Sequence, residues 1–266
     1  TEGTVGGALW LDDFDVFALA SGADLTVGGA VDIHARQSMT GQPDATLAGA
    51  DITLRSRFGD IGTESTGFDI ELTGGVLRAF AANDAWITSA AAVPLQRLEA
   101  GDEVVLTAAG AITNPRADDE ANVAAPTARL SGLSIGTPAA PLVTEVETLS
   151  LRSGISGAFG ARATSGTGVF VRELDDLRLD EAWFDGVAAD LGGETRIEAL
   201  GDLTVTQAMR APGHEVTLRA HEELRFDGDA AALEAGDAVL EAGDLARFAA
   251  GSTVDAAQTL RVTADD

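Results

Sequence analysis

Acidic side chains are the groups most able to do chemistry in this sequence of 266 residues, because cysteine is absent and only three histidines occur. Three acidic clusters offer the oxygen ligands that Ca²⁺ prefers: Asp12-Asp13-Phe14-Asp15, Asp175-Asp176 and Asp227-Gly228-Asp229. Neither an EF-hand loop nor the Gly-Gly-x-Gly-x-Asp repeat of calcium-binding β-rolls accompanies them. We expect solvent-exposed turn carboxylates, no metal ligands and no cofactor, with Ca²⁺ as the alternative.

A second group of acids recurs at one place in a repeated segment. Asp176, Asp202 and Glu223 each precede a leucine, and Asp244 precedes Leu245 in the same way. Paired carboxylates catalyse glycoside hydrolysis, so this column could belong to a carbohydrate-active enzyme. Acids are also favoured turn residues, and a net charge of −26 would repel polyanionic substrates. We therefore expect these acids at turns, and we expect no catalytic residue.

Two further patterns match catalytic or metal-binding motifs in residue type, but without the structural context that such motifs require. Gly132-Leu133-Ser134-Ile135-Gly136 matches the nucleophile elbow, which requires a strand, a sharp turn and then a helix. Leu133 to Ile135 alternates like a strand and Pro138 opposes a following helix, so we interpret the match as chance. The histidines His34, His214 and His221 are scattered, and we expect the last two at solvated corners of one coil.

Composition narrows the possible partners. The charge arises from 43 acids against 17 bases, all of which are arginine, and this balance argues against binding nucleic acid or anionic lipid. Apolar runs are shorter than the roughly 20 residues of a membrane-spanning helix, and no signal peptide is visible. The sequence begins at Thr1 and ends just after a strand-like segment, from which we expect an excerpt of a longer protein.

A repeat of about 22 residues supplies the elements that would position these side chains. Ile197 recurs as Leu218, Leu240 and Val262, at offsets of 21, 22 and 22, and Val171 precedes Ile197 by 26. A second column follows the same spacing: Leu203 with Leu224, then Val205 with Phe226 and Phe248. Each unit alternates with period two, which is typical of half-buried strands, and its corners carry Gly, Asp or Glu.

Looser copies of the unit precede residue 170. The clearest are Asp24–Val27 with Val31–Ile33, Asp51–Leu54 with Gly59–Thr63, Glu103–Ala108 with Ala111–Thr113, Ala128–Leu130 with Leu133–Ile135, and Leu149–Leu151 with Ile155. Arg116–Pro126 is predicted to be a polar loop, and Asp180–Asp190 a short turn or helix. Ile61-Gly62-Thr63 recurs as Ile135-Gly136-Thr137 at an offset of 74, which leaves a higher-order repeat open.

These patterns predict an all-β fold with little helix, a right-handed parallel β-solenoid formed by residues 1–266 as one domain. The coils should be irregular over 1–170 and regular over 171–264. A sandwich would need hairpin turns such as Asn-Gly, which the sequence lacks. About twelve coils at a strand spacing of roughly 4.8 Å would form a rod about 55–60 Å long. The threonines Thr53, Thr107, Thr204 and Thr217 do not predict the regular column of an ice-binding solenoid.

Ala48–Thr63 and Ala100–Thr113 resemble the coils of filamentous-haemagglutinin-like adhesins, which are large bacterial surface proteins with β-helix stalks. The export domain of that family is not recognisable, although Ile112-Thr113-Asn114-Pro115 is similar to its Asn-Pro turns. The resemblance implies an extended surface that is secreted to the bacterial cell surface or into a biofilm.

We therefore expect an extracellular structural or adhesive repeat region that contacts a host or matrix surface, either protein or glycan. The chain should neither bind nucleic acid nor insert into a membrane. Two alternatives stay open. One is a subunit of a filament or surface layer that associates end to end, and the other is a carbohydrate-active β-helix enzyme.

Overall fold

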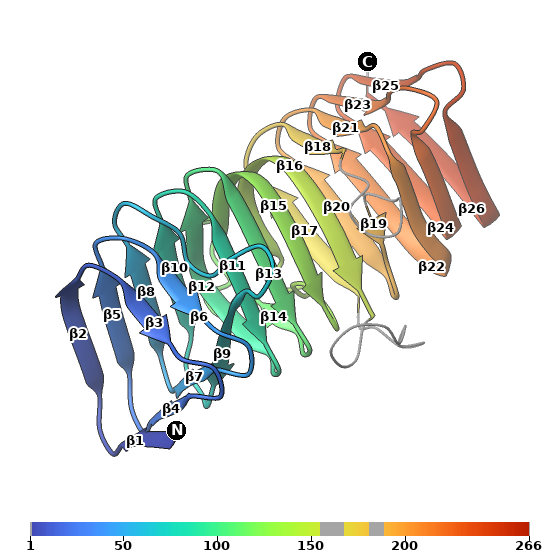
Figure 1. The fold of residues 1–266 in the computed structure, drawn as a ribbon. Coiled ribbons are helices and arrows are strands. Elements are labelled where there is room, and N and C mark those ends of the chain that lie inside the picture. Colours follow the sequence, from blue (N-terminus) through green and yellow to red (C-terminus); the bar gives the residue numbers. More distant parts are fainter. Residues whose placement is uncertain (1, 155–167, 181–188, 266) are drawn as a thin grey trace.

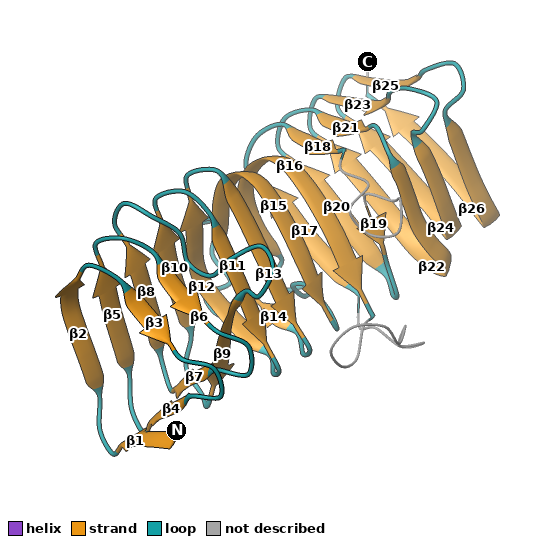
Figure 2. Cartoon of the chain, in the orientation of Figure 1, coloured by secondary structure: helices purple, strands orange, loops and turns teal. Residues whose placement is uncertain are grey.

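A computed structural model describes residues 2–154, 168–180 and 189–265, and it gives the side chains of all of these except Asp13, Ala189 and Asp190. Most of the segment expected to be a turn or helix, 180–190, lies outside these residues, as does Ile155. The described residues form 26 strands and no helix, and every strand pairing is parallel. The strands wind into about 11 stacked turns (Figures 1 and 2), so the predicted β-solenoid is confirmed. The right-handed winding stays a prediction.

Each turn has three faces. The first face begins with β1 (Glu2–Val5), β4 (Asp24–Val27), β7 (Thr46–Gly49) and β9 (Phe68–Leu72), and it later includes β19 (Ala189–Asp190). The second face contains β2 (Leu9–Phe14), β5 (Val31–Ala35), β8 (Ile52–Ser56), β10 (Leu77–Ala81), β12 (Val93–Ala100), β14 (Ile112–Thr113), β17 (Val169–Glu173) and β20 (Thr195–Ala199). The third face contains β3 (Phe17–Leu19), β6 (Met39–Gly41), β18 (Leu177–Leu179), β21 (Leu203–Val205), β23 (Glu223–Phe226) and β25 (Leu245–Phe248).

Longer strands bend around a corner and contribute to two or three faces. They are β11 (Ala85–Ser89), β13 (Glu103–Ala108), β15 (Val123–Gly132), β16 (Leu142–Ser153), β22 (Ala208–Ala220), β24 (Ala232–Ala242) and β26 (Thr253–Ala264). Since β15 begins at Val123, the polar loop predicted for Arg116–Pro126 is shorter than expected. Its last four residues belong to β15, and Val123, Ala124 and Ala125 among them already pair with the neighbouring coil.

Inward side chains explain why the repeat is visible in the sequence. Ile197, Leu218, Leu240 and Val262 stand in register on the second face, as the offsets predicted. Phe226 stacks on Phe248 with ring centroids 5.2 Å apart. Identical or similar apolar residues recur because every coil presents the same position to the one above it.

The last coil departs from the predicted alignment. Leu224 pairs with Ala246, which places Leu245 beside Glu223. Leu245 is consequently 43% exposed, and Asp244 lies one position outside the column of acids to which the sequence assigned it. The corner at Gly243 is as long as the one before it, since four positions lead from Ala220 to Leu224 and from Ala242 to Ala246. The alignment of Asp244 with Asp176, Asp202 and Glu223 was therefore wrong, because a uniform offset of 22 places Asp244 opposite Glu222.

The two Ile-Gly-Thr segments are one local structure that occurs twice. Ile61 and Ile135 each form an isolated bridge to both neighbouring coils, and each is followed by a glycine in the left-handed region, with φ of 82° at Gly62 and 65° at Gly136. The peptide oxygens of the two isoleucines accept equivalent 2.7 Å hydrogen bonds from Trp86 and Phe170. Ile61 lies on the third face and Ile135 at the start of the second. The offset of 74 residues therefore corresponds to three whole turns plus two faces.

Substitution of Gly62 tests whether this corner can accommodate a side chain. Replacement by alanine adds a Cβ that overlaps the carbonyl oxygen of Trp86 in the next coil, at a φ that alanine also disfavours. We expect Gly62→Ala to lower the free energy of unfolding by about 3 kcal/mol or more. Gly22→Ala is the matched control, since Gly22 has a φ of 64° and open space around it, and it should cost only about 1 kcal/mol. Urea denaturation measures both, and equal losses would contradict the proposed clash.

Candidate functional site: an arginine–glutamate cluster on the second face

The acidic clusters suggested as calcium ligands lie apart. Asp12 is exposed within β2, and Asp15 is exposed directly after this strand. Asp175 and Asp176 are exposed in the turn before β18, and Asp227 and Asp229 are exposed after β23. Among the described residues, no three His, Asp or Glu side chains are placed to hold a metal ion together. Calcium binding stays an untested alternative.

The column of acids before the leucines supports the backbone of the next coil. Asp176 Oδ1 accepts a 2.8 Å hydrogen bond from the N–H of Asp202, and Asp202 Oδ1 accepts one of 2.9 Å from the N–H of Glu223. Each carboxylate thus holds the following turn in place, as expected of turn residues. Asp51 does the same for the N–H of Val76 at 2.9 Å.

Ser134, His34 and His221 were the remaining candidates from the sequence, and each has a defined position in the coils. Ser134 is buried in a corner whose backbone continues into the Ile135 bridge, and no helix follows it. His34 lies on the outer side of β5, 2.9 Å from Asp32 and 3.4 Å from Asp12. His221 lies at a corner as expected, but its Nε2 is 3.0 Å from Glu198 Oε1, so it is hydrogen-bonded and not merely solvated.

Glu198 is the centre of the densest group of charges on the second face. Its side chain is only 9% exposed although it points outward from β20. Three arginines and one histidine surround it: Arg172 at 3.4 Å, Arg196 at 3.7 Å, Arg219 at 3.5 Å and His221 at 3.0 Å. The strand register explains this geometry, because Arg172, Glu198 and Arg219 are direct neighbours in one outward column.

The charges in this cluster determine the protonation state of Glu198. Burial raises the pKa of the Glu198 carboxyl, but the hydrogen bond with His221 and the three guanidinium groups lower it further than burial raises it. The pKa is therefore below the ordinary value for glutamate, and the carboxylate is charged at neutral pH. Such a group is a poor general acid, because it holds no proton to donate.

A loop between β14 and β15 covers one side of the cluster. Asn122 is fully buried, donates from Nδ2 to the carbonyl of Leu95 at 2.9 Å, and accepts at Oδ1 from the N–H of Val143 at 2.9 Å. Asn114 Oδ1 accepts hydrogen bonds from the next turn of the loop, at Arg116 and Ala117. These two side chains fix the loop so that Asp119 reaches Arg172 at 2.7 Å.

A cavity of about 180 Å³ lies where this loop meets the outer face of the sheet. It is lined by loop residues 117–119 and 138–141, by 170–172 of β17, and by Arg196 and Glu198 of β20. The walls therefore combine guanidinium donors, carboxylate acceptors and the apolar surfaces of Phe170 and two prolines. That combination suits a polar ligand with hydroxyl or carboxylate groups.

Glu173 is a second buried carboxylate, but it points into the coil. It is fully buried and accepts hydrogen bonds from Thr144 Oγ1 at 2.7 Å and from the N–H groups of Val146 and Leu174 at 3.1 and 3.0 Å. Burial raises its pKa to about 7, although these hydrogen bonds oppose the rise. The strands lose their equal spacing here, because three residues lie between Thr144 and Thr148 while four lie between Glu173 and Arg178. The carboxylate accepts the hydrogen bond of the Val146 N–H at this mismatch, and the Leu174 N–H donates both to Glu173 and to the carbonyl of Thr144.

Sequence reasoning missed the Glu198 cluster and Glu173. The Arg-x-Glu pattern of Arg196-Ile197-Glu198 marks outward positions of a strand, which was a usable signal. The proximity of Arg172, Arg219 and His221 could have been predicted from the same repeat offsets. Glu173 carried no such signal, because it occupies the inward position at which Ala199, Ala220 and Ala242 follow in the next coils.

Replacing Glu198 should destabilise the coils around it. Glu198→Gln removes the charge that separates three arginines, and we expect the free energy of unfolding to fall by about 2 kcal/mol at pH 7. Glu241→Gln is the control in the same column, because Glu241 is 36% exposed and 3.9 Å from Arg219, and it should cost less than about 0.5 kcal/mol. Urea denaturation compares the two variants. Equal effects would show that the cluster has no special stabilising role.

The raised pKa of Glu173 predicts that the stability of the fold decreases as pH rises. In the unfolded chain this carboxyl titrates near 4.5, whereas in the folded chain its pKa is about 7. Between these values the unfolded state loses the proton first, so the contribution of Glu173 to stability falls as pH rises, by up to about 3 kcal/mol.

Glu173→Gln keeps a neutral side chain at all pH values and should remove this decline. The measurement is the melting temperature from pH 4 to pH 8, with Glu145→Gln on the exposed side of β16 as control. An unchanged pH profile in Glu173→Gln would rule out Glu173 as the source.

Among the described residues, no helix could cross a membrane. Comparisons of this chain with protein-family models, with curated proteins and with solved structures found no match. The description of the fold therefore depends on the strand register of this chain alone. The description of the candidate site depends on the geometry of Glu198 and the loops beside it.

Proposed function

We propose that this chain is a rigid segment of an extracellular adhesive protein, which presents contacts from the loops at its corners. The observation that supports this most is that every described strand pairs in parallel with the equivalent strand of a neighbouring coil, which makes one stiff rod from a chain without disulfides. The resemblance of two segments to filamentous-haemagglutinin-like coils, together with the acidic surface, supports a bacterial cell-surface location.

The cavity beside Glu198 is the contact that we propose for ligand binding. Its loops interrupt an otherwise even surface, and two buried asparagines hold one of them in a fixed shape. Arg196 is half exposed and lies 3.7 Å from Glu198, beyond a strong hydrogen bond, so its guanidinium can turn toward a ligand. A glycan would use both the charged groups and the apolar surfaces of Pro138 and Pro141.

A filament or surface-layer subunit is the second candidate. Inward residues of the last coil are exposed at the end of the rod, Leu260 to 49% and Val262 to 43%. These apolar surfaces favour stacking of a further coil, from more of the same chain or from a second copy. A carbohydrate-active enzyme remains the third candidate, and the low pKa of Glu198 favours binding over proton transfer at this cavity.

A glycan array tests adhesion directly. We expect the fluorescently labelled chain to bind a defined subset of carbohydrates, and Arg196→Ala to weaken that binding at least tenfold because it removes a charged donor from the cavity. Arg261→Ala is the matched control, since Arg261 occupies the same outward column three coils further on and should leave binding unchanged. Absence of any bound glycan, or equal loss in both variants, would contradict glycan binding at this cavity.

Antibodies against the chain test location independently. They should label intact cells of the source organism without permeabilisation. Labelling that requires permeabilised cells would contradict an extracellular rod, whatever the array shows.

A further inference from the structure

One carboxylate oxygen of Glu198 keeps capacity to accept a hydrogen bond from a ligand. Glu198 Oε2 lies 3.4 Å from Arg172 and 3.7 Å from Arg196, and both distances exceed the roughly 2.7–3.2 Å of a well-formed hydrogen bond. The other oxygen, Oε1, lies 3.0 Å from His221 and 3.5 Å from Arg219. The weakly bonded oxygen is therefore the one that faces the two arginines of the cavity wall.

The arginines of this wall already have acidic neighbours. The guanidinium Nη1 of Arg172 donates to Asp119 Oδ1 at 2.7 Å, and its Nε lies 3.4 Å from Glu198. Together with Arg196 and Asp118, these residues make a wall of two arginines and three carboxylates, with a formal charge of −1. The wall therefore has no excess of positive charge to compensate a negatively charged ligand.

The loops that border the cavity are fixed by side-chain hydrogen bonds. Asn114 Nδ2 in the first loop donates to the carbonyl of Pro141 in the second loop at 3.0 Å. Thr137 Oγ1 accepts from the N–H of Ala140 at 3.0 Å, which fixes the turn of the second loop. The cavity volume of about 180 Å³ is below the roughly 300–1,000 Å³ typical of sites for drug-sized ligands. A preformed cavity of this size suits one sugar ring.

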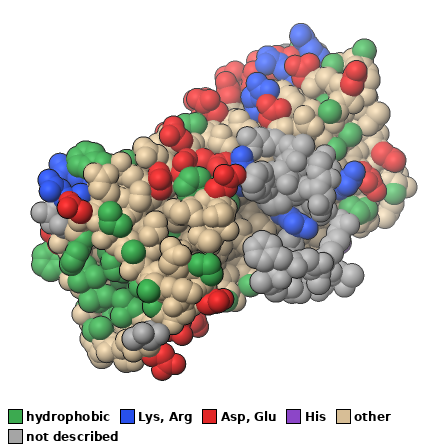
Figure 3. Space-filling model, viewed as in Figure 1, with side chains coloured by type: hydrophobic (Ala, Val, Ile, Leu, Met, Phe, Trp, Pro, Cys, Tyr) green, Lys and Arg blue, Asp and Glu red, His purple; other side chains and the backbone are tan. Residues whose placement is uncertain are grey.

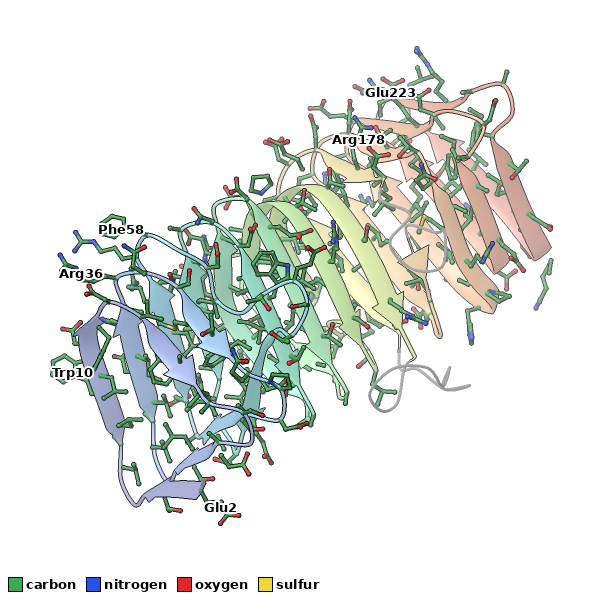
Figure 4. All side chains as sticks on the ribbon, in the orientation of Figure 1. Glu2, Trp10, Arg36, Phe58, Arg178 and Glu223 are labelled. Carbon is green, nitrogen blue, oxygen red and sulfur yellow. The ribbon has the colours of Figure 1, made fainter. Side chains whose placement is uncertain are left out.

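Paired charges also occur outside this cavity. Figure 3 shows acidic and basic side chains beside one another over the C-terminal coils, and Figure 4 shows Arg178 and Glu223 on these coils. Arg178 pairs with Asp180, and Glu223 pairs with Arg225 and Arg247. None of these residues lines the cavity. Pairing alone therefore indicates no ligand, and the cavity differs because fixed loops hold its charged pairs around a hollow.

We propose that the cavity binds one neutral sugar ring through its hydroxyl groups and discriminates against acidic sugars. The proposal rests on the glycan binding proposed above and names the class of sugar. A hydroxyl group both donates and accepts, so it can donate to Glu198 Oε2 and accept from Arg196 without adding charge. The C–H groups of the ring then pack against Pro138 and Pro141.

An acidic sugar fits these charges less well. A uronic acid carries a carboxylate where the neutral sugar carries a hydroxymethyl group, and a carboxylate only accepts hydrogen bonds. It can pair with Arg196, but it offers no donor to Glu198 Oε2 and adds a fourth negative charge to the three of the wall. To reach Arg172 it must displace Asp119, which its own loop holds at 2.7 Å. We therefore expect acidic sugars to bind more weakly.

Matched methyl glycosides test this specificity. Methyl glucoside and methyl glucuronoside differ only at C6, as do the corresponding galactose and mannose pairs. NMR titration of the whole chain measures the dissociation constant of each. In the pair that binds, the neutral member should have a dissociation constant at least about tenfold lower than the acidic member.

Asp119→Ala should abolish the preference for the neutral member. The substitution leaves Arg172 Nη1 free for a ligand carboxylate, so the affinity for the acidic member should rise about tenfold, while the neutral member still binds through Glu198. Glu120→Ala is the matched control and should keep the wild-type ratio. It removes the same charge from the same loop, but Glu120 is 75% exposed and pairs with Arg116, and neither residue lines the cavity.

The outcomes separate this specificity from glycan binding as such. Tighter binding of the acidic members to the wild type would overturn the specificity but leave glycan binding in place. An unchanged ratio in Asp119→Ala, loss of both members in that variant, or an equal change in Glu120→Ala would also overturn it. Absence of binding by every methyl glycoside would contradict a site for one ring if the glycan array is positive. A negative array would contradict glycan binding itself.

Discussion

Parallel hydrogen bonding between successive coils is the constraint on which the rest of this structure depends. Each strand is a fixed spacing of roughly 4.8 Å from its equivalent in the next turn, so a side chain meets nearly the same side chain above and below it. Inward positions must therefore hold residues that stack on themselves, such as the leucines around Leu218 or the pair Phe226 and Phe248. Corners must hold residues that let the backbone turn without disturbing its neighbour, which is why Gly62 and Gly136 have positive φ.

Loops enter this stack only where polar side chains satisfy the backbone that they disturb. Asn122 replaces ladder partners for Leu95 and Val143 beside the loop that follows β14. Glu173 performs the same role where neighbouring coils differ by one residue at the corner after β17. Both groups are fully buried, and a buried polar group without partners would cost far more than these arrangements do. The irregular part of the rod is thus stabilised by hydrogen bonds where the regular part relies on apolar stacking.

The arginines of this strongly acidic chain are distributed unevenly over its surface. Three of the chain's arginines gather around Glu198, and Arg57 lies over the exposed ring of Phe58 near the start of the chain. The stacking of coils explains this uneven distribution. An outward residue of one coil lies next to the equivalent residues of the coils above and below it. A few substitutions in one column therefore create a local patch of charge without altering the core.

The sequence by itself determined the architecture and much of the register. Its offsets near 22 residues placed Ile197, Leu218, Leu240 and Val262 in one column, because stacked coils select similar residues at equivalent positions. Tertiary structure alone decided that Ile61 and Ile135 lie on different faces, since corner geometry depends on the coil beneath. The repeat offsets also place Arg172 and Arg219 beside Glu198. Only tertiary structure brought the loop fixed by Asn114 and Asn122 to this cluster, because Asp119 and Arg172 are far apart in the chain and no repeat offset connects them.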